Sequence, residues 1–186
     1  GAALQNSKNV PMLRLEFRTK STDNTAVLEA LRLDLRGTGV DSDIVSVKVW
    51  KDPGKDGVDN DTGSVEGVYP NLLSAGNDFF NQRTTLVRLN EGLVISSMPA
   101  VLYVTVDISE FGQVGKTLGL AIDSTDYFTV AIPDGKQAGG VFPAVSALTV
   151  ITEAASVVTM GVNDIAGSAG SVVQGQTNVP VLRFNM

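Results

Sequence analysis

The chain has 186 residues, enough for one large domain or two small ones, and its 43% apolar and 18% charged residues are typical of a globular protein. A net charge of −6 with scattered basic residues argues against a nucleic-acid partner, which needs clustered lysine and arginine. No apolar run approaches the roughly 18 residues of a membrane span, so we expect no such span.

Cysteine and histidine are both absent from the chain. The first absence removes disulfides, thiolate metal sites and cysteine nucleophiles. The second removes the commonest general base and the commonest transition-metal ligand. We therefore expect a protein that is not an enzyme.

Most of the chain shows the alternation of apolar and polar residues that is typical of strands with one buried face. Weaker strand candidates cover 84–89 and 93–95, and Gly, Asn, Asp and Pro separate the segments, as turns require. About eight short strands of this kind predict an all-β protein, an antiparallel β-sandwich. In chain order, the alternating apolar positions are Leu13, Leu15 and Phe17; Leu31, Leu33 and Leu35; Val45, Val47 and Val49; Leu102, Val104, Val106 and Ile108; Leu118, Leu120 and Ile122; and Phe128, Val130 and Ile132.

The last third of the chain has a different composition. Residues 134–144 are polar and glycine-rich at first and predict a crossing loop or an extended segment that bridges to the sandwich. Residues 156–162 (SVVTMGV) predict another short strand. Residues 163–171 are rich in Gly, Ser and Ala and predict a flexible joint. A new segment with a strand pattern then follows.

This final segment repeats the beginning of the chain. With an offset of 169 residues, 170–186 match 1–17 at seven of seventeen positions without a gap, whereas unrelated segments would share about one. The alternatives are coincidence or two similar strands of one sheet. A repeat of this length is typical of whole domains in tandem. We expect a sandwich domain at 1–150, a terminal strand and joint at 151–169, and the beginning of the next repeat at 170–186. The identical pairs are Gly1 with Gly170, Gln5 with Gln174, Asn9 with Asn178, Val10 with Val179, Pro11 with Pro180, Leu13 with Leu182, and Arg14 with Arg183.

The repeated segment allows two kinds of linkage. It either begins the next domain of a tandem chain or adds as a donor strand to a neighbouring domain, where backbone hydrogen bonds supply affinity and alternate side chains fill pockets. Head-to-tail strand addition builds open filaments, so the expected partners are copies of the chain or neighbouring repeats. The residues expected to anchor such a strand are Val179, Val181, Leu182 and Phe184.

Three stretches together resemble a known class of domain. They are RGTGVDSDIVSVKVWKD at 36–52, the NVPxLR strand, and FPAVSALTV at 142–150. They resemble repeat units of very large bacterial surface and extracellular proteins, which are similar to immunoglobulin-like sandwiches in tandem. The resemblance implies an immunoglobulin-like fold, a structural or adhesive role outside the cell, and no catalytic residue. It also implies that the acidic turn after the WKD strand holds calcium, as in some members.

The residues of that turn can be judged directly. Residues 52–63 read DPGKDGVDNDTG, and flexible loops rich in aspartate supply the oxygen ligands that calcium needs. The candidate calcium ligands are Asp52, Asp56, Asp59 and Asp61. The spacing does not match the EF-hand pattern, and the alternative is a solvated turn built from ordinary turn residues.

Two further hypotheses compete with a structural role. Trp50 with Tyr69, Phe79 and Phe80 would form a stacking platform in an adhesive or carbohydrate-binding module. Carboxylates at 107, 123 and 126 would be paired in a glycosidase. We expect a structural repeat of an extracellular filament or surface array, with the binding module as the alternative.

Overall fold

The computed structural model describes residues 1–20, 24–52, 71–132, 134–136, 140–154, 161–162 and 184–185. They fall into two compact units, 1–154 and 155–186, which are described separately. Among these residues no helix is long and apolar enough to cross a bilayer, and the predicted all-β class is confirmed. The elements are β1 (Ala2–Leu4), β2 (Val10–Phe17), β3 (Ala26–Arg36), the 3-10 turn η1 (Asp41–Asp43), β4 (Ile44–Lys51), β5 (Thr84–Ile95), β6 (Ala100–Ile108), β7 (Thr117–Ile122), the 3-10 turn η2 (Thr125–Tyr127), β8 (Phe128–Val130), β9 (Ala144–Val145), β10 (Thr149–Thr152), β11 (Gly161–Val162) and β12 (Phe184–Asn185).

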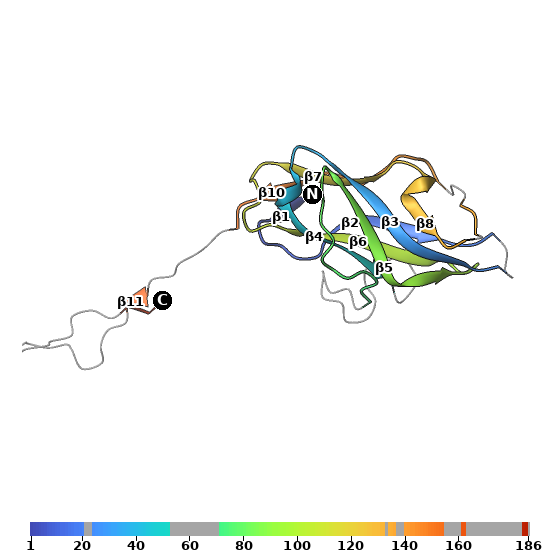
Figure 1. The fold of residues 1–186 in the computed structure, drawn as a ribbon. Coiled ribbons are helices and arrows are strands. Elements are labelled where there is room, and N and C mark those ends of the chain that lie inside the picture. Colours follow the sequence, from blue (N-terminus) through green and yellow to red (C-terminus); the bar gives the residue numbers. More distant parts are fainter. Residues whose placement is uncertain are drawn as a thin grey trace, which may run out of the picture. The chain divides into compact units, whose positions relative to one another are not determined.

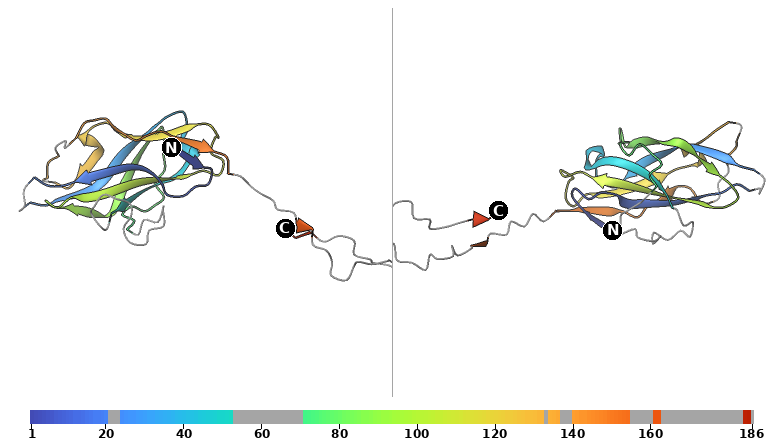
Figure 2. Two further views of the ribbon diagram at one scale, coloured as in Figure 1. Left: turned by 180° about the vertical axis from the view of Figure 1, so that it is seen from behind. Right: turned by 90° about the horizontal axis from the view of Figure 1, so that it is seen from below.

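The larger sheet of the first unit has seven strands (Figure 1). Its order is β1-β10-β7-β3-β5, with β8 paired to β3 and β9 paired to β7. The β1–β10 pair is parallel, so both strands run toward the end of the unit where the chain leaves at Ala154. Both views of Figure 2 show the N-terminus beside β10, drawn in orange. The first and last strands of the unit therefore lie side by side at one edge.

The smaller sheet has three antiparallel strands in the order β2-β6-β4, which makes β2 an edge strand. Residues 71–81 run along the other side of β4, where the Val47 N–H donates to the Asp78 carbonyl. The same segment reaches the larger sheet, because the Asn90 N–H on β5 donates to the Leu73 carbonyl. Residues 71–81 thus connect the two sheets at the side opposite β2.

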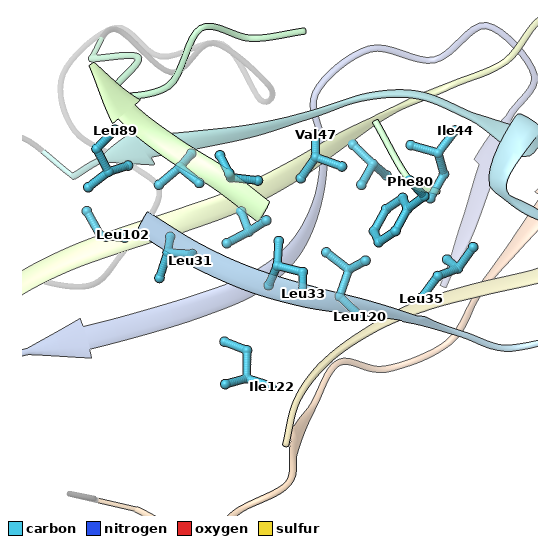
Figure 3. Close-up of a cluster of buried hydrophobic side chains, with 14 of the residues drawn as sticks. Leu31, Leu33, Leu35, Ile44, Val47, Phe80, Leu89, Leu102, Leu120 and Ile122 are labelled. Carbon is cyan, nitrogen blue, oxygen red and sulfur yellow. The ribbon is translucent and has the colours of Figure 1, made fainter. Parts of the chain in front are cut away.

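The two sheets enclose one hydrophobic core (Figure 3). Leu31, Leu33 and Leu35 point inward from β3, and Val47 and Leu102 point inward from the other sheet. All five are buried, as their alternation with polar residues predicts, because successive side chains of a strand point to opposite faces. Burial of large aliphatic side chains contributes about 1.5–3 kcal/mol each, so this core is the main stabilising feature of the unit.

Three strand predictions need correction. The predicted inward position of Val45 is wrong, because the register shifts between Ile44 and Ser46 and leaves Val45 exposed. Ile132 lies beyond the end of β8 and is 96% exposed, so its predicted burial is wrong too. The separate candidates at 84–89 and 93–95 form one continuous strand, β5, whose apolar alternation is interrupted at Glu91 and Gly92.

Strand β6 is buried along its whole length. Its apolar positions face the core as predicted, but the alternate positions Tyr103, Thr105 and Asp107, expected to face water, are buried as well, as is Val101. On this outer face, the Trp50 Nε1–H donates to Thr105 Oγ1 at 2.8 Å, and Trp50 packs with Val101 and Tyr103. The smaller sheet is therefore covered on both faces at its central strand.

The second unit is described at two short strands. Gly161 pairs with Asn185, and Val162 pairs with Phe184, in an antiparallel arrangement. The first of these strands coincides with the end of the strand predicted at 156–162.

Candidate assembly site

Of the four residues predicted to anchor a donor strand, the structure describes one. Val179, Val181 and Leu182 lie outside the described residues, while Phe184 belongs to β12 and pairs with Val162. The first copy of the repeated segment, residues 1–17, is described in full, so the site can be built from it.

Residues 1–5 dock along the last strand of the unit. The N-terminal amine donates to the Leu148 carbonyl at 2.9 Å, and the Val150 N–H donates to the Gly1 carbonyl at 2.9 Å. Ala3 is buried in the core, whereas its neighbours on β1 are exposed. Residues 1–5 thus close the edge of the larger sheet with a short parallel strand.

Gln5 ties this segment to the end of the unit. Its Nε2–H donates to the Gly112 carbonyl at 2.7 Å, and its Oε1 accepts from the Ala154 N–H at 3.4 Å. Its own backbone N–H donates to the Thr152 carbonyl. One side chain therefore connects the β6–β7 loop to the point where the chain leaves the unit.

Asn9 joins a largely buried charged cluster on the outer face of the smaller sheet. Lys48 Nζ donates to both carboxylate oxygens of Asp107, at 2.9 and 2.8 Å, and to Asn9 Oδ1 at 2.9 Å. The Asn9 N–H donates to Asp107 Oδ1 at 2.9 Å. Asn9 has a φ of +54°, a conformation that Asn adopts more readily than most residues. An asparagine therefore meets both the backbone and the hydrogen-bonding requirements here.

The carboxyl of Asp107 is held in its charged form. Burial acts to raise its pKa, but the hydrogen bonds from Lys48 and the Asn9 N–H, with the charges of Lys48 and Lys8, outweigh burial and lower the pKa below its ordinary value of 3.8. The Lys8 Nζ lies 3.8 Å from Asp107 Oδ2. The cluster thus joins Lys8 and Asn9 of segment 1–17 to Lys48 and Asp107 of the smaller sheet.

Strand β2 completes the docking of the first copy. It pairs with β6 from Val10 to Phe17, with a register shift between Pro11 and Leu13. Proline lacks a backbone donor and is found on edge strands and at bulges, and both conditions hold at Pro11. Leu13 packs on the core, and Arg14 is exposed opposite Tyr103.

The repeated residues are largely those with a defined structural contact. Four of the seven identical residues have such a contact. Gln5 binds at the point where the chain leaves the unit, and Asn9 binds Lys48 and Asp107. Pro11 lies at the register shift of β2, and Leu13 contacts the core. Sequence reasoning found the repeat but missed Lys48 and considered Asp107 only as a glycosidase carboxylate, because the alternation assigned both to a solvent-exposed face. The available signal was the identity of Asn9 and Asn178 just before a strand, where an asparagine marks a left-handed residue.

Of the four candidate calcium ligands, only Asp52 lies among the described residues. Asp52 follows β4, is 3% exposed, and donates its backbone N–H to the Val101 carbonyl. Asp56, Asp59 and Asp61 lie outside the described residues. Within the described ranges, no three acidic side chains come together in a way that could hold a metal ion.

The residues of the competing hypotheses are separated or covered. Asp107 is bound by Lys48, and Asp123 is bound by both oxygens to Arg36 Nη2 at 2.8 and 2.9 Å. Trp50 is buried and Phe80 belongs to the core, so these aromatic rings form no exposed platform; Tyr69 lies outside the described residues.

No family model, curated protein or solved structure matches this chain.

Proposed function

We propose that this chain is a structural repeat of an extracellular filament or surface array, in which immunoglobulin-like β-sandwiches follow one another. The proposal depends on one observation. The residues by which segment 1–17 docks on the first unit recur as the same amino acids at the corresponding positions of 170–186. Gln174 and Asn178 repeat the residues that bind Gly112, Ala154, Lys48 and Asp107 in the first unit. This repetition supports a similar domain body as the acceptor of the second segment.

Two sheets around one core, antiparallel except for the β1–β10 pair, support the immunoglobulin-like assignment. The resemblance of 36–52 and 142–150 to repeats of bacterial surface proteins supports the extracellular location. Simple tandem linkage is favoured over a donor strand that fills an empty groove, because β2 of the same chain already pairs along β6.

An extended chain tests the tandem proposal. A second copy of residues 18–154 placed after Met186 would supply a body for 170–186. We expect two cooperative unfolding events of similar size when one molecule is stretched, against one event for the 186-residue chain. A single event in the extended chain would contradict the tandem proposal.

Strand addition between chains makes a different prediction. If residues 178–186 join separate chains, the 186-residue protein assembles without a ligand into particles with a regular axial repeat in electron microscopy. A chain ending at residue 177 then stays monomeric. If both chains sediment as monomers, assembly by strand addition is excluded and tandem linkage remains.

The adhesive or carbohydrate-binding alternative loses its sequence basis at Trp50, which is buried and donates its indole N–H to Thr105. Phe79 remains exposed, but one aromatic ring is a weak basis for sugar stacking. Binding of a chain that ends at residue 177 to glycans on an array would restore this alternative.

Calcium binding at the acidic loop remains part of the proposal, supported by the buried carboxylate of Asp52 at the beginning of the loop. A ligand that binds only the folded state raises the melting temperature. We expect calcium at about millimolar concentration to do so, and Asp52→Asn to reduce the increase. An unchanged melting temperature of the parent chain would exclude calcium binding at this loop.

A further inference from the structure

We propose that strand β2 pairs with β2 of a second copy of this chain, antiparallel and around a two-fold axis at Leu15. The pair joins two first units side by side and involves residues 13–17 of each copy. It goes beyond the proposed function, which concerns units that follow one another along one chain, and it does not depend on it.

β2 has an open edge along its length. Its strand neighbour is β6, and no other described segment forms a bridge or a backbone hydrogen bond with residues 10–17. The other edges are short or bridged, since β1 has three residues, β4 is bridged at Val47 and Trp50, and β5 is bridged at Thr84 and Leu89. An open edge strand presents unpaired N–H and C=O groups, which are what a further strand needs.

The inner side chains of β2 retain exposed apolar surface. Leu13, Leu15 and Phe17 pack against the core, yet all three are only partly buried. On the neighbouring strand β6, the inner residues Leu102 and Val104 are completely buried. The difference follows from position, because β6 has a strand on either side and β2 has one. A partner strand would cover this remaining apolar surface, and its burial would favour association.

The edge is held in place by the larger sheet. The Phe17 ring packs edge-to-face on Phe128, with ring centroids 5.2 Å apart. Toward the other end of β2, the Thr149 hydroxyl donates to Met12 Sδ at 4.0 Å. A strand that is already ordered loses little conformational freedom when it binds, and this lowers the free-energy cost of association.

The outer side chains decide which partner fits the edge. Arg14 and Glu16 flank Leu15, and their side chains are 43% and 44% exposed. In an antiparallel pair centred on Leu15, Arg14 of each copy lies opposite Glu16 of the other copy, and Leu13 lies opposite Phe17. Opposite charges and apolar pairs that face each other across two strands are both stabilising. β2 is therefore complementary to a second β2.

Charge also selects the register of the pair. A shift by one residue would place the charged face of one strand beside the apolar face of the other. A shift by two residues centres the pair on Arg14 or on Glu16, where like charges then face each other and destabilise it. The register shift of β2 between Pro11 and Leu13 ends the regular pairing at Leu13. Pairing centred on Leu15 thus satisfies both charged positions.

A single pair of this kind is weak, because five residues of each copy form a small interface and small interfaces are transient. Where units follow one another in tandem, several pairs act together and strengthen the association without any new contact. Only this last consequence rests on the proposed function. It gives chains that lie side by side, as a surface array requires.

Charge reversal in the full chain tests the pair. We expect the parent chain to form dimers in sedimentation equilibrium at about millimolar concentration. Arg14→Glu and Glu16→Arg should each weaken dimerisation at least about tenfold, because two attractive pairs become repulsive. The double variant restores opposite charges and should dimerise within about threefold of the parent. Both side chains are exposed, so urea unfolding should show that every variant is folded.

Mixing the two single variants gives a result that a folding defect cannot imitate. The Arg14→Glu chain is acidic at both charged positions, and the Glu16→Arg chain is basic at both. An equimolar mixture should therefore form heterodimers at a concentration where each variant alone is monomeric. Absence of heterodimers, or single variants that dimerise like the parent, would overturn the proposal.

A crosslink reports the register, because the chain has no cysteine of its own. Leu15→Cys places the two thiols opposite each other, with Cα atoms about 4.5–5.5 Å apart, within reach of a disulfide. Leu13→Cys is the matched control, because it lies on the same face but is about 14 Å from its own copy along the strands. We expect oxidation to crosslink the first variant and not the second. Equal crosslinking of both would overturn the proposal.

The outcomes separate this inference from the proposed function. Strand addition by residues 178–186 joins chains through a different segment, so the comparison with the chain that ends at residue 177 is made with Glu16→Arg in both chains. Dimers that persist in Glu16→Arg and vanish when residues 178–186 are deleted would overturn the β2 pair and support strand addition. If the β2 pair fails while the extended chain still shows two unfolding events, the tandem repeat stands.

Discussion

Two charged networks lie on the outer faces of the two sheets, and they differ in burial. On the smaller sheet, the Lys48 and Asp107 side chains are 16% and 9% exposed. On the larger sheet, the Arg36 and Asp123 side chains are 45% and 38% exposed, although their hydrogen bonds are just as short.

The exposed network is the more extensive of the two. Arg36 binds both oxygens of Asp123, and Tyr127 donates its hydroxyl to Asp34 at 2.8 Å. The hydrogen bond to Asp34 is the main cause that raises the pKa of Tyr127, and the one to Asp123 is the main cause that raises the pKa of Arg36. Arg32 lies over the Tyr127 ring.

The comparison teaches that burial, more than the number of partners, decides the energetic weight of a charged network. Exposed ion pairs contribute about 0–1 kcal/mol, because water competes with the pair and salt screens it. Removing one partner of a buried pair costs about 3–5 kcal/mol, because the other charge stays uncompensated. The buried network therefore holds segment 1–17 in place, while the exposed one adds little stability.

The largest effect is expected from Asp107→Ala. This change leaves the largely buried Lys48 charge, 16% exposed, without its carboxylate and removes the acceptor of the Asn9 N–H, so the free energy of unfolding should fall by about 2–3 kcal/mol. Urea unfolding measures the change. The double variant Lys48→Met with Asp107→Leu is the control, and it should recover more than half of the loss because no buried charge remains. A loss below about 1 kcal/mol for Asp107→Ala would mean that the network behaves as an exposed one.

A smaller loss of about 1–2 kcal/mol is expected from Asn9→Ala. The change removes the acceptor for Lys48 and places alanine at a φ of +54°. Asn9→Gly separates the two causes, because glycine tolerates this φ but has no amide. If glycine and alanine destabilise equally in urea, the backbone conformation contributes nothing measurable.

Acid should weaken the buried network with a definite sign. The folded-state pKa of Asp107 lies below its ordinary value of 3.8, so its stabilising contribution is fully present above pH 3.8 and is lost as pH falls through the lower folded-state pKa. The parent chain should therefore lose more stability than Asp107→Asn between pH 5 and the acid limit. Parallel curves of unfolding free energy against pH would contradict this assignment.

The smallest effect is expected from Asp123→Ala on the other sheet. Its partner Arg36 is nearly half exposed, so the loss should be about 0.5 kcal/mol or less. The difference from the parent chain should shrink further in high salt. A loss as large as that of Asp107→Ala would remove the distinction between the two networks.

Much of the fold was predictable from local pattern. The inward positions Leu31, Leu33 and Leu35 of β3 follow from their alternation with polar residues, because alternate side chains of a strand point to the same face. The alternation failed where a second layer or a register shift intervened, at β6 and at Val45. Neither feature has a local sequence signal, since both depend on segments distant in the chain.

The candidate site was predictable only in part. The repeat identified segment 170–186 and, through it, segment 1–17. The partners of that segment, Lys48, Asp107, Gly112 and Ala154, are 39 to 149 residues away from the residues they bind. No spacing rule relates them, because the sheet topology brings them together.

The sequence by itself determined the all-β class and the repetition, since alternation and identity are written along the chain. Only the tertiary structure decided which repeated residues bind what, that both N-terminal strands lie at sheet edges, and that one charged network is buried. The physical reason is that burial depends on what covers a surface, and the covering segments come from elsewhere in the chain.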